Sequence, residues 1–266
     1  MRHKNALSFY LIVIFLLLVF PSRLLALAPE KLTFEVTWSG LGVGEVSVEL
    51  SGDGPNMKIL GEGRSAAWVS IFYKISDTLA THLEREEFES ALAGHPYSFN
   101  YRKMLHEDKL RLHEEITMSK KTAEARYLDH LKKHESRKTR EGTAYDPLTL
   151  FYYIRRLPLS VGNTSRFQLL DRDGLYEVEV QVIRKEKIKT ALGAFDAILL
   201  KPVVKDIPGD RGLMYIKGDL YIWLTDDEKR LPVLVQKTAD VPLPRVIPKS
   251  LREGMKKAKM TLKKIE

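Results

Sequence analysis

The chain has 266 residues, no cysteine and a formal net charge of +8. This length suffices for one large β domain or two small ones, and the lack of cysteine excludes disulfide bonds, so the fold must rest on its core. Residues 1–28 carry +3 and residues 245–266 carry +6, which leaves −1 for residues 29–244. The basic character therefore belongs to the two ends of the chain.

The first 28 residues are typical of an export signal. A basic start at residues 2–4 precedes a mostly apolar run of 15 residues, 6–20, which has the length of a signal peptide rather than of a full membrane span. Ala26-Leu27-Ala28 offers small residues for cleavage, but Pro29 disfavours a cut directly before it. A cut after Ala26 and retention as an uncleaved anchor are the alternatives. Without a nearby cysteine, a bacterial lipid anchor is excluded.

Alternating apolar and polar residues predict strands in the first part of the chain. Such runs occupy residues 32–38, 46–50, 57–63 and 75–83. The first two flank the turn at residues 39–42 and predict a hairpin. Residues 66–73 (AAWVSIFY) are apolar without alternation, which favours a short helical turn over a buried strand.

Three further alternating runs predict a meander with one solvated face. They occupy residues 97–101, 110–118 and 123–127. Residues 102–140 hold twelve Lys and Arg against seven Asp and Glu. On antiparallel strands this excess usually marks a water-facing surface, and an anion-binding face is the alternative.

The stretch from Tyr145 to Thr164 predicts the main helix, over about residues 147–156. Asp146 is suited to cap the helix, and Pro147 is suited to its first turn. Their spacing would place four residues on one face of this helix: Leu148, Phe151, Tyr152 and Arg155. Leu157-Pro158 ends the helix.

Hairpin signals recur after the helix. Predicted strands occupy residues 166–170, 176–183, 188–192, 195–204, 214–224, 231–237 and 259–265. Prolines at 242, 244 and 248 place residues 241–248 in a loop or at a sheet edge. About a dozen short strands with one clear helix predict a mainly β fold, with an antiparallel sheet curved into a barrel or a partly open barrel. One continuous sheet is favoured over a division near residues 141–146.

No catalytic or cofactor motif stands out in the sequence. A nucleophile elbow, a P-loop and a dinucleotide fingerprint are absent. His130 and His134 could share a zinc ion on a helix, but neither HExxH nor a third ligand at a usual spacing is present. Exposed histidines on a basic loop are the simpler interpretation. We predict no metal and no other cofactor.

Other candidates have structural explanations. The glycine-rich residues 40–44 lie between two strands and offer no helix N-terminus to a phosphate. Asp226 and Asp227 fit a hairpin tip. Aromatic and basic side chains that could stack on bases or sugars share one strand: Tyr215, Lys217, Tyr221 and Trp223. Packing across a sheet is their more usual role in an exported protein, so no nucleic acid is expected as a partner.

Four stretches, in order, carry a resemblance to a known family. They are WSGLGVGEVSVEL, YDPLTLFYYIRRLPLSVGNT, LGAFDAILLKP and LYIWLTDDEKRLPVLVQ. Over roughly residues 32–237, the chain resembles the exported bacterial family known as domain of unknown function 3108. The resemblance implies a β-rich protein of the Gram-negative envelope. It implies no catalytic residues, because none are established for that family.

These observations predict an exported, periplasmic or membrane-associated protein with a signal peptide at 1–28, a β-rich domain at 29–244 and a basic tail at 245–266 that includes a possible last strand. The leading hypothesis is a non-catalytic binding or carrier module for an apolar or lipid-like envelope molecule. The alternatives are an assembly partner with a filled core and, less favoured, a hydrolase of envelope polymers.

A carrier needs an apolar cavity. The residues predicted to line it are Trp38, Phe72, Leu150, Phe151 and Trp223. The tail offers a second hypothesis, contact with an anionic membrane surface. The lysines predicted to make that contact are Lys256, Lys257, Lys259, Lys263 and Lys264.

Overall fold

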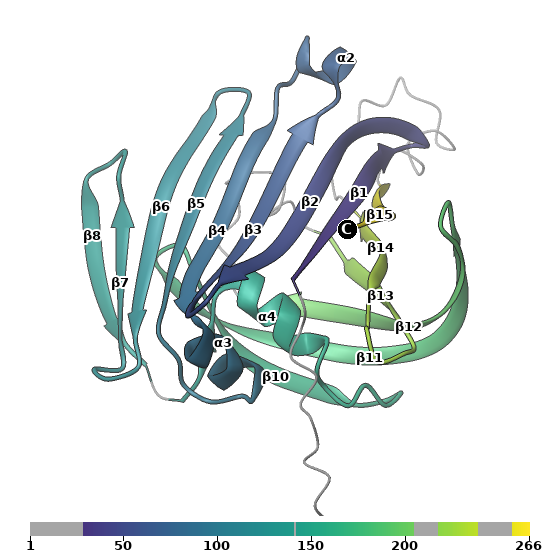
Figure 1. Ribbon diagram of the computed structural model, residues 1–266. Helices are drawn as coiled ribbons and strands as arrows, with labels where there is room; N and C mark the ends of the chain where they lie inside the picture. The colour runs from purple at the N-terminus through teal and green to yellow at the C-terminus, as the bar shows by residue number, and fades with distance from the viewer. Residues whose placement is uncertain (1–28, 141, 205–217, 239–256) are drawn as a thin grey trace, which may run out of the picture.

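A computed structural model describes residues 29–140, 142–204, 218–238 and 257–266. The predicted signal peptide, Tyr215, Lys217, the prolines at 242–248 and Lys256 lie outside the described residues. The described part is built on one 15-stranded sheet that curves but does not close (Figure 1). The predicted fold class, a curved antiparallel sheet with few helices, is thereby confirmed.

The first half of the chain forms one wall as a meander. Its strands are β1 (Glu30–Trp38), β2 (Leu41–Asp53), β3 (Asn56–Ser65), β4 (Ser76–Glu84), β5 (Phe99–Glu107), β6 (Leu110–Ser119), β7 (Glu124–Asp129) and β8 (His134–Thr139). Each pairs antiparallel with the next. The short helix α2 (Ala67–Ser70) confirms the expected helical turn. Helix α3 (Arg85–Leu92) follows β4 and was not predicted.

The second half forms the opposite wall. Its elements are β9 (Ala144–Tyr145), α4 (Pro147–Ile154), β10 (Thr164–Asp171), β11 (Gly174–Thr190), β12 (Gly193–Val204), β13 (Leu220–Thr225), β14 (Pro232–Thr238) and β15 (Lys257–Ile265). The sheet order is β8-β7-β6-β5-β4-β3-β2-β1-β15-β14-β13-β12-β11-β10-β9. The last strand, β15, therefore joins the halves by pairing with both β1 and β14.

Helix α4 lies inside the curve of the sheet (Figure 1). Asp146 caps it, because its Oδ1 accepts from the backbone N–H groups of Leu148 and Thr149 at 3.0 and 3.1 Å. Leu148, Leu150 and Tyr152 are buried in a core that includes residues of both walls. The helix ends at Ile154, two residues before the predicted end.

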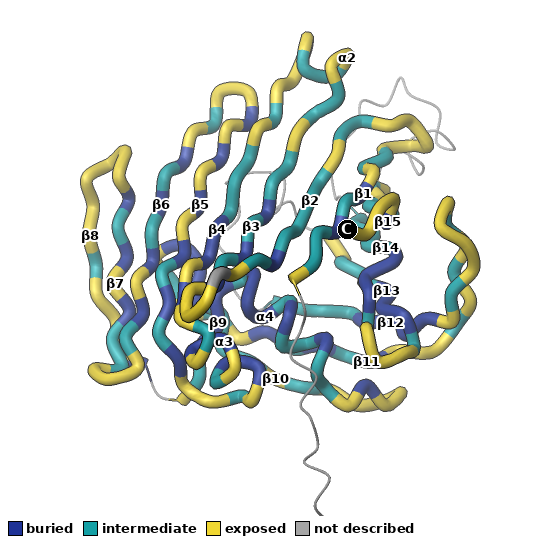
Figure 2. Tube along the Cα trace, in the orientation of Figure 1, coloured by how far each residue is buried: buried dark blue, intermediate teal, exposed yellow. Residues whose placement is uncertain are grey.

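The basic segment 102–140 faces water only in part. Along β5, every second residue from Phe99 to Glu107 is buried, and Figure 2 shows buried and exposed positions alternating along this strand. The buried set includes Lys103. Glu114 on β6 and Asp129 on β7 are also buried. Most charged side chains of the segment are exposed, as expected of a water-facing surface, but strand alternation carries several of them inward.

Candidate functional site

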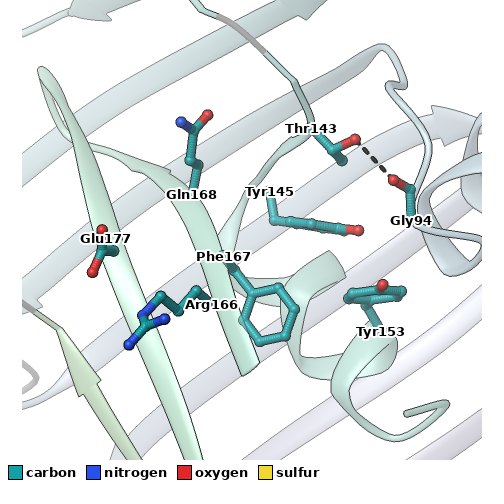
Figure 3. A pocket seen from close by; sticks show the side chains of 8 residues that line it. All are labelled: Gly94, Thr143, Tyr145, Tyr153, Arg166, Phe167, Gln168 and Glu177. Carbon is teal, nitrogen blue, oxygen red and sulfur yellow. Dashed lines mark hydrogen bonds between the residues drawn. The ribbon is translucent and has the colours of Figure 1, made fainter. Parts of the chain in front are cut away.

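A hollow of about 280 Å³ opens to solvent at the end of the sheet where β9 lies on β10 (Figure 3). We call it the seam hollow, since β9, which contributes to its lining, is one of the two edge strands of the unclosed sheet. Its lining residues are Gly94, Thr143, Tyr145, Tyr153, Arg166, Phe167, Gln168 and Glu177. They come from the turn after α3, from β9 and the residue before it, and from α4, β10 and β11.

Three aromatic rings form the apolar side of the seam hollow. The rings of Tyr145 and Tyr153 stack with centroids 4.9 Å apart and an interplanar angle of 15°. Phe167 stands nearly perpendicular to both rings, with its centroid 5.6 Å from that of Tyr153. Burial raises the pKa of the Tyr145 phenol, and the nearby Tyr153 adds to the rise. Tyr145 therefore stays neutral and donates a hydrogen bond to the carbonyl of Ala91 at 3.2 Å.

A glycine shapes one border of the seam hollow. Gly94 follows the C-terminus of α3 with a φ of +81°, a conformation that glycine adopts without strain. A Cβ at this position would lie 2.9 Å from the Tyr153 hydroxyl oxygen. The Gly94 carbonyl accepts a hydrogen bond from Thr143 Oγ1 at 2.9 Å, as Figure 3 shows. This bond fixes the chain just before β9.

The other side of the seam hollow is polar. Arg166 Nε donates to Glu179 Oε1 at 2.8 Å, and this bond raises the pKa of the Arg166 guanidinium. Glu177 is exposed. The Oε1 atom of Gln168 is buried and accepts no hydrogen bond from the described residues. A buried amide oxygen without a donor is costly in a native structure.

The edge of β10 beside the hollow is open. Strand β9 pairs with β10 only at Gln168 and Leu169, in parallel. Residues 164–167 extend beyond β9 and have no strand partner on this side among the described residues. The chain before Ala144 turns toward Gly94 and away from this edge (Figure 3).

Alternation along β10 decides which backbone groups face the open edge. Asp171 and Gly174 flank a two-residue hairpin turn, so they form a hydrogen-bonded pair. The antiparallel register continues without a bulge, which directs the backbone groups of Phe167 and Ser165 toward β11. The N–H and C=O groups of Thr164 and Arg166 therefore point toward the open edge.

The five residues predicted to line an apolar cavity do not come together. Leu150 and Trp223 are buried in two different core clusters, and Phe151 packs partly buried against the cluster of Leu150. Trp38 is 37% exposed at the end of β1, and Phe72 is 81% exposed after α2. A second hollow, of about 410 Å³ beside Met57 and His82, also opens to solvent and includes none of the five.

The histidines of the meander lie on its surface. His130 follows β7, stacks on His113 with centroids 4.2 Å apart, and lies 3.2 Å from Glu115 Oε2. His134 begins β8 rather than following on a helix. In the part of the chain that the structure describes, no group of three His, Asp or Glu side chains could hold a metal ion, and no helix is long and apolar enough to cross a membrane.

Comparison with known proteins identifies the family. The family model for a protein of unknown function, DUF3108, matches residues 33–243. The chain belongs to the DUF3108 family. The resemblance seen in the sequence is thereby confirmed. No curated protein matches this DUF3108 chain.

Two solved structures are similar to the DUF3108 chain. A β-barrel-like protein from Brucella abortus, of domain of unknown function DUF1849, has a TM-score of 0.58 and 10% identity, over 91% of this chain and 98% of that one. A Bacteroides fragilis protein with a YmcC-like fold has a TM-score of 0.35 and 11% identity, over 89% and 95% of the two chains. At such identities the first likeness concerns the fold alone.

Sequence reasoning did not find the seam hollow. Tyr145 and Tyr153 lie in the stretch that predicts the main helix, but neither was named as a candidate site residue. The other lining residues are distant in sequence, and none belongs to a motif. The open edge could have been found only from the pairing of β9, a strand of two residues that carries no periodic signal.

Proposed function

We propose that this DUF3108 protein is an exported, non-catalytic interaction module of the Gram-negative envelope that binds an extended peptide segment of a partner protein at the seam hollow. The observation that carries the proposal is the open edge of β10 beside an aromatic hollow. An extended peptide adds to an open edge through main-chain hydrogen bonds, and an adjacent pocket selects its side chains. Strand β9 already uses the next two residues of the same edge in this way.

The chemistry of the hollow indicates what such a peptide carries. The rings of Tyr145, Tyr153 and Phe167 suit one large apolar or aromatic side chain. In the parallel direction that β9 follows, the peptide places its backbone beside Thr164 and Arg166 and its apolar side chain against the rings.

The packing of the interior favours this proposal over an internal carrier site. Helix α4 fills the space between the walls with buried side chains, and the two hollows reported above both open to solvent. The export part of the proposal is supported by the basic start and apolar run of residues 1–28.

Selection of peptides from a random phage-displayed library on the full-length protein tests the proposal. Selected peptides are synthesised, and their Kd values are measured by fluorescence anisotropy. We expect Arg166→Pro, which removes the edge N–H, to weaken binding by about tenfold. Arg166→Ala keeps that N–H and serves as the matched control, for which we expect a change below about twofold. Equal affinity of wild type and Arg166→Pro would overturn the proposal.

Hydrogen exchange supplies a readout that needs no substitution. The selected peptide should slow amide exchange at Thr164 and Arg166 and leave exchange in strand β13, which does not line the hollow, unchanged. Protection confined to another part of the sheet, or a library that yields no peptide dependent on residues 164–168, would contradict binding at the β10 edge.

A further inference from the structure

A second surface lies at the end of the sheet that carries α2. Six large apolar side chains from β1, β2, α2 and the residues after α2 are exposed there, by 37% to 81%. We call this set the aromatic rim; its members are Trp38, Leu41, Trp68, Ile71, Phe72 and Tyr73. Figure 1 shows α2 projecting beyond the ends of the neighbouring strands, and Figure 2 shows this projection as mostly exposed.

Polar bonds hold the aromatic rim in place. Trp68 Nε1 donates to the carbonyl of Gly42 at 3.0 Å, which ties α2 to the start of β2. The Ser65 and Ser70 hydroxyls lie 2.7 Å apart, and Ser65 Oγ also accepts from the N–H of Ile75 at 2.9 Å. Helix α2 has no buried residue. The apolar side chains of the rim therefore do not serve the core, and their exposure requires a different explanation.

Basic side chains flank the aromatic rim. Strand β15 begins beside Trp38, since Ala258 pairs with Trp38 and Lys259 with Thr37. Lys257 and Lys259 are exposed there, and Lys74 is exposed directly after Tyr73. These three lysines form no ion pair with the described residues. Acids also lie at this end of the sheet: burial raises the pKa of the Tyr73 phenol, and the nearby carboxylates of Glu107, Asp108 and Asp77 add to the rise. The excess of lysines is therefore confined to the side of the rim where β15 begins beside Trp38.

We infer that the aromatic rim docks onto an anionic phospholipid bilayer. Trp and Tyr side chains favour the membrane–water interface, and Ile and Phe favour the acyl region below it. Lysines beside such a patch attract anionic headgroups. The inference extends the expected role of the tail lysines: Lys257 and Lys259 act with the rim, whereas Lys263 and Lys264 lie at the other end of β15, near Glu45 and Glu266. It does not depend on peptide binding at the seam hollow.

Vesicle sedimentation with the full chain tests the inference. The probes are phosphatidylcholine vesicles with and without phosphatidylglycerol. We expect Ile71→Ser combined with Phe72→Ser to lower binding to mixed vesicles by roughly tenfold or more, since two exposed apolar side chains lose their contact with lipid. Lys257→Gln with Lys259→Gln should lower binding only where phosphatidylglycerol is present, and added salt should reduce the difference.

Leu131→Ser is the matched control, because Leu131 is 55% exposed at the turn before β8, far from the rim in the sheet order. It should leave binding unchanged, and any contribution of residues 1–28 is common to all variants. The altered side chains are exposed, so melting temperatures should not change.

Equal binding by the wild type and the rim variant would refute the inference. A wild type that self-associates and a monomeric rim variant would also refute it, by assigning the rim to contact between copies.

Discussion

Lys103 Nζ on β5 lies 2.5 Å from Asp171 Oδ1 at the end of β10, and the side chains of both residues are almost fully buried. Glu114 Oε2 on β6 lies 3.3 Å from the same ammonium group, and Tyr127 donates to Glu114 Oε1 at 3.0 Å. This cluster joins the meander wall to the hairpin of β10 and β11. It therefore helps to hold the two halves of an unclosed sheet around α4.

Removing the ammonium group of this cluster should be strongly destabilising. Lys103→Met keeps the apolar stem but leaves the carboxylates of Asp171 and Glu114 buried together. We expect a loss of about 3–5 kcal/mol in the free energy of unfolding, measured by urea denaturation. The triple variant Lys103→Met, Glu114→Gln, Asp171→Asn should recover most of this loss, because it leaves no buried charge in the cluster. A triple variant no more stable than Lys103→Met would contradict this account.

The cluster also shows where sequence reasoning reached its limit. The alternation of β5 and β6 was visible, and it predicted the meander correctly. The charges of residues 102–140 were counted together, although strict alternation places Lys103 with Tyr101 and Leu105 on the inward face. The partner, Asp171, lies 68 residues away, and no local pattern announces a contact across the interior.

The two longer helices show the same limit, since one was predicted from the sequence and the other was not. Helix α4 was predicted because Asp146 and Pro147 give a start signal that acts within one turn. Helix α3 also carried signals, namely acids in its first turn, Phe88, Ala91 and Leu92 on one face, and Gly94 after its end. They were overlooked between two strands. The seam hollow and the aromatic rim depend on strand order, which sequence periodicity does not supply.

Substitution of Gly94, at the border of the seam hollow, should lower the stability of the fold and displace the Tyr153 side chain that lines the hollow. Gly94→Ala places a side chain at a φ of +81° and brings its Cβ near the Tyr153 hydroxyl. We expect a loss of about 1–2 kcal/mol in thermal or urea unfolding. Gly142→Ala is a useful comparison, since its φ is +71° and no atom lies within 4 Å of the added Cβ. The displacement of Tyr153 should weaken peptide binding only in Gly94→Ala; equal binding by the two variants would show that Tyr153 does not shape the site.

The cap of α4 should make stability depend on pH. Burial raises the pKa of the Asp146 carboxyl, against the hydrogen bonds from Thr149 and Thr81 that lower it. The folded state therefore binds this proton more tightly than the unfolded state. The stabilising contribution of that proton is complete below the unfolded pKa of about 3.9 and is lost as the pH rises through the folded-state pKa.

Asp146→Asn removes this titration and keeps an oxygen for the cap. We expect the difference in unfolding free energy between wild type and Asp146→Asn to move in favour of the variant as the pH rises from acid to neutral. Urea titrations at a series of pH values measure it. Asp146→Ala, which deprives the Thr81 hydroxyl of its acceptor at 2.6 Å, should lose about 2–4 kcal/mol at neutral pH. A difference that moves toward the wild type with rising pH would mean that the folded-state pKa is lowered.

The stability of the fold should depend on the planar guanidinium group of Arg155, at the C-terminal end of α4. Arg155 is buried, and its guanidinium contacts both carboxylate oxygens of Glu30 on β1 and donates to the carbonyl of Lys229 at 3.0 Å. One planar group thus links α4 to the first strand and to the turn between β13 and β14. Arg155→Lys keeps the charge but cannot make the paired contact and reach Lys229 together. We expect Arg155→Lys to lose about 2 kcal/mol or more in urea unfolding, while Arg156→Lys, at a half-buried neighbour, should change stability by less than about 0.5 kcal/mol. If Arg155→Lys lost as little stability as Arg156→Lys, a positive charge alone would be sufficient at position 155.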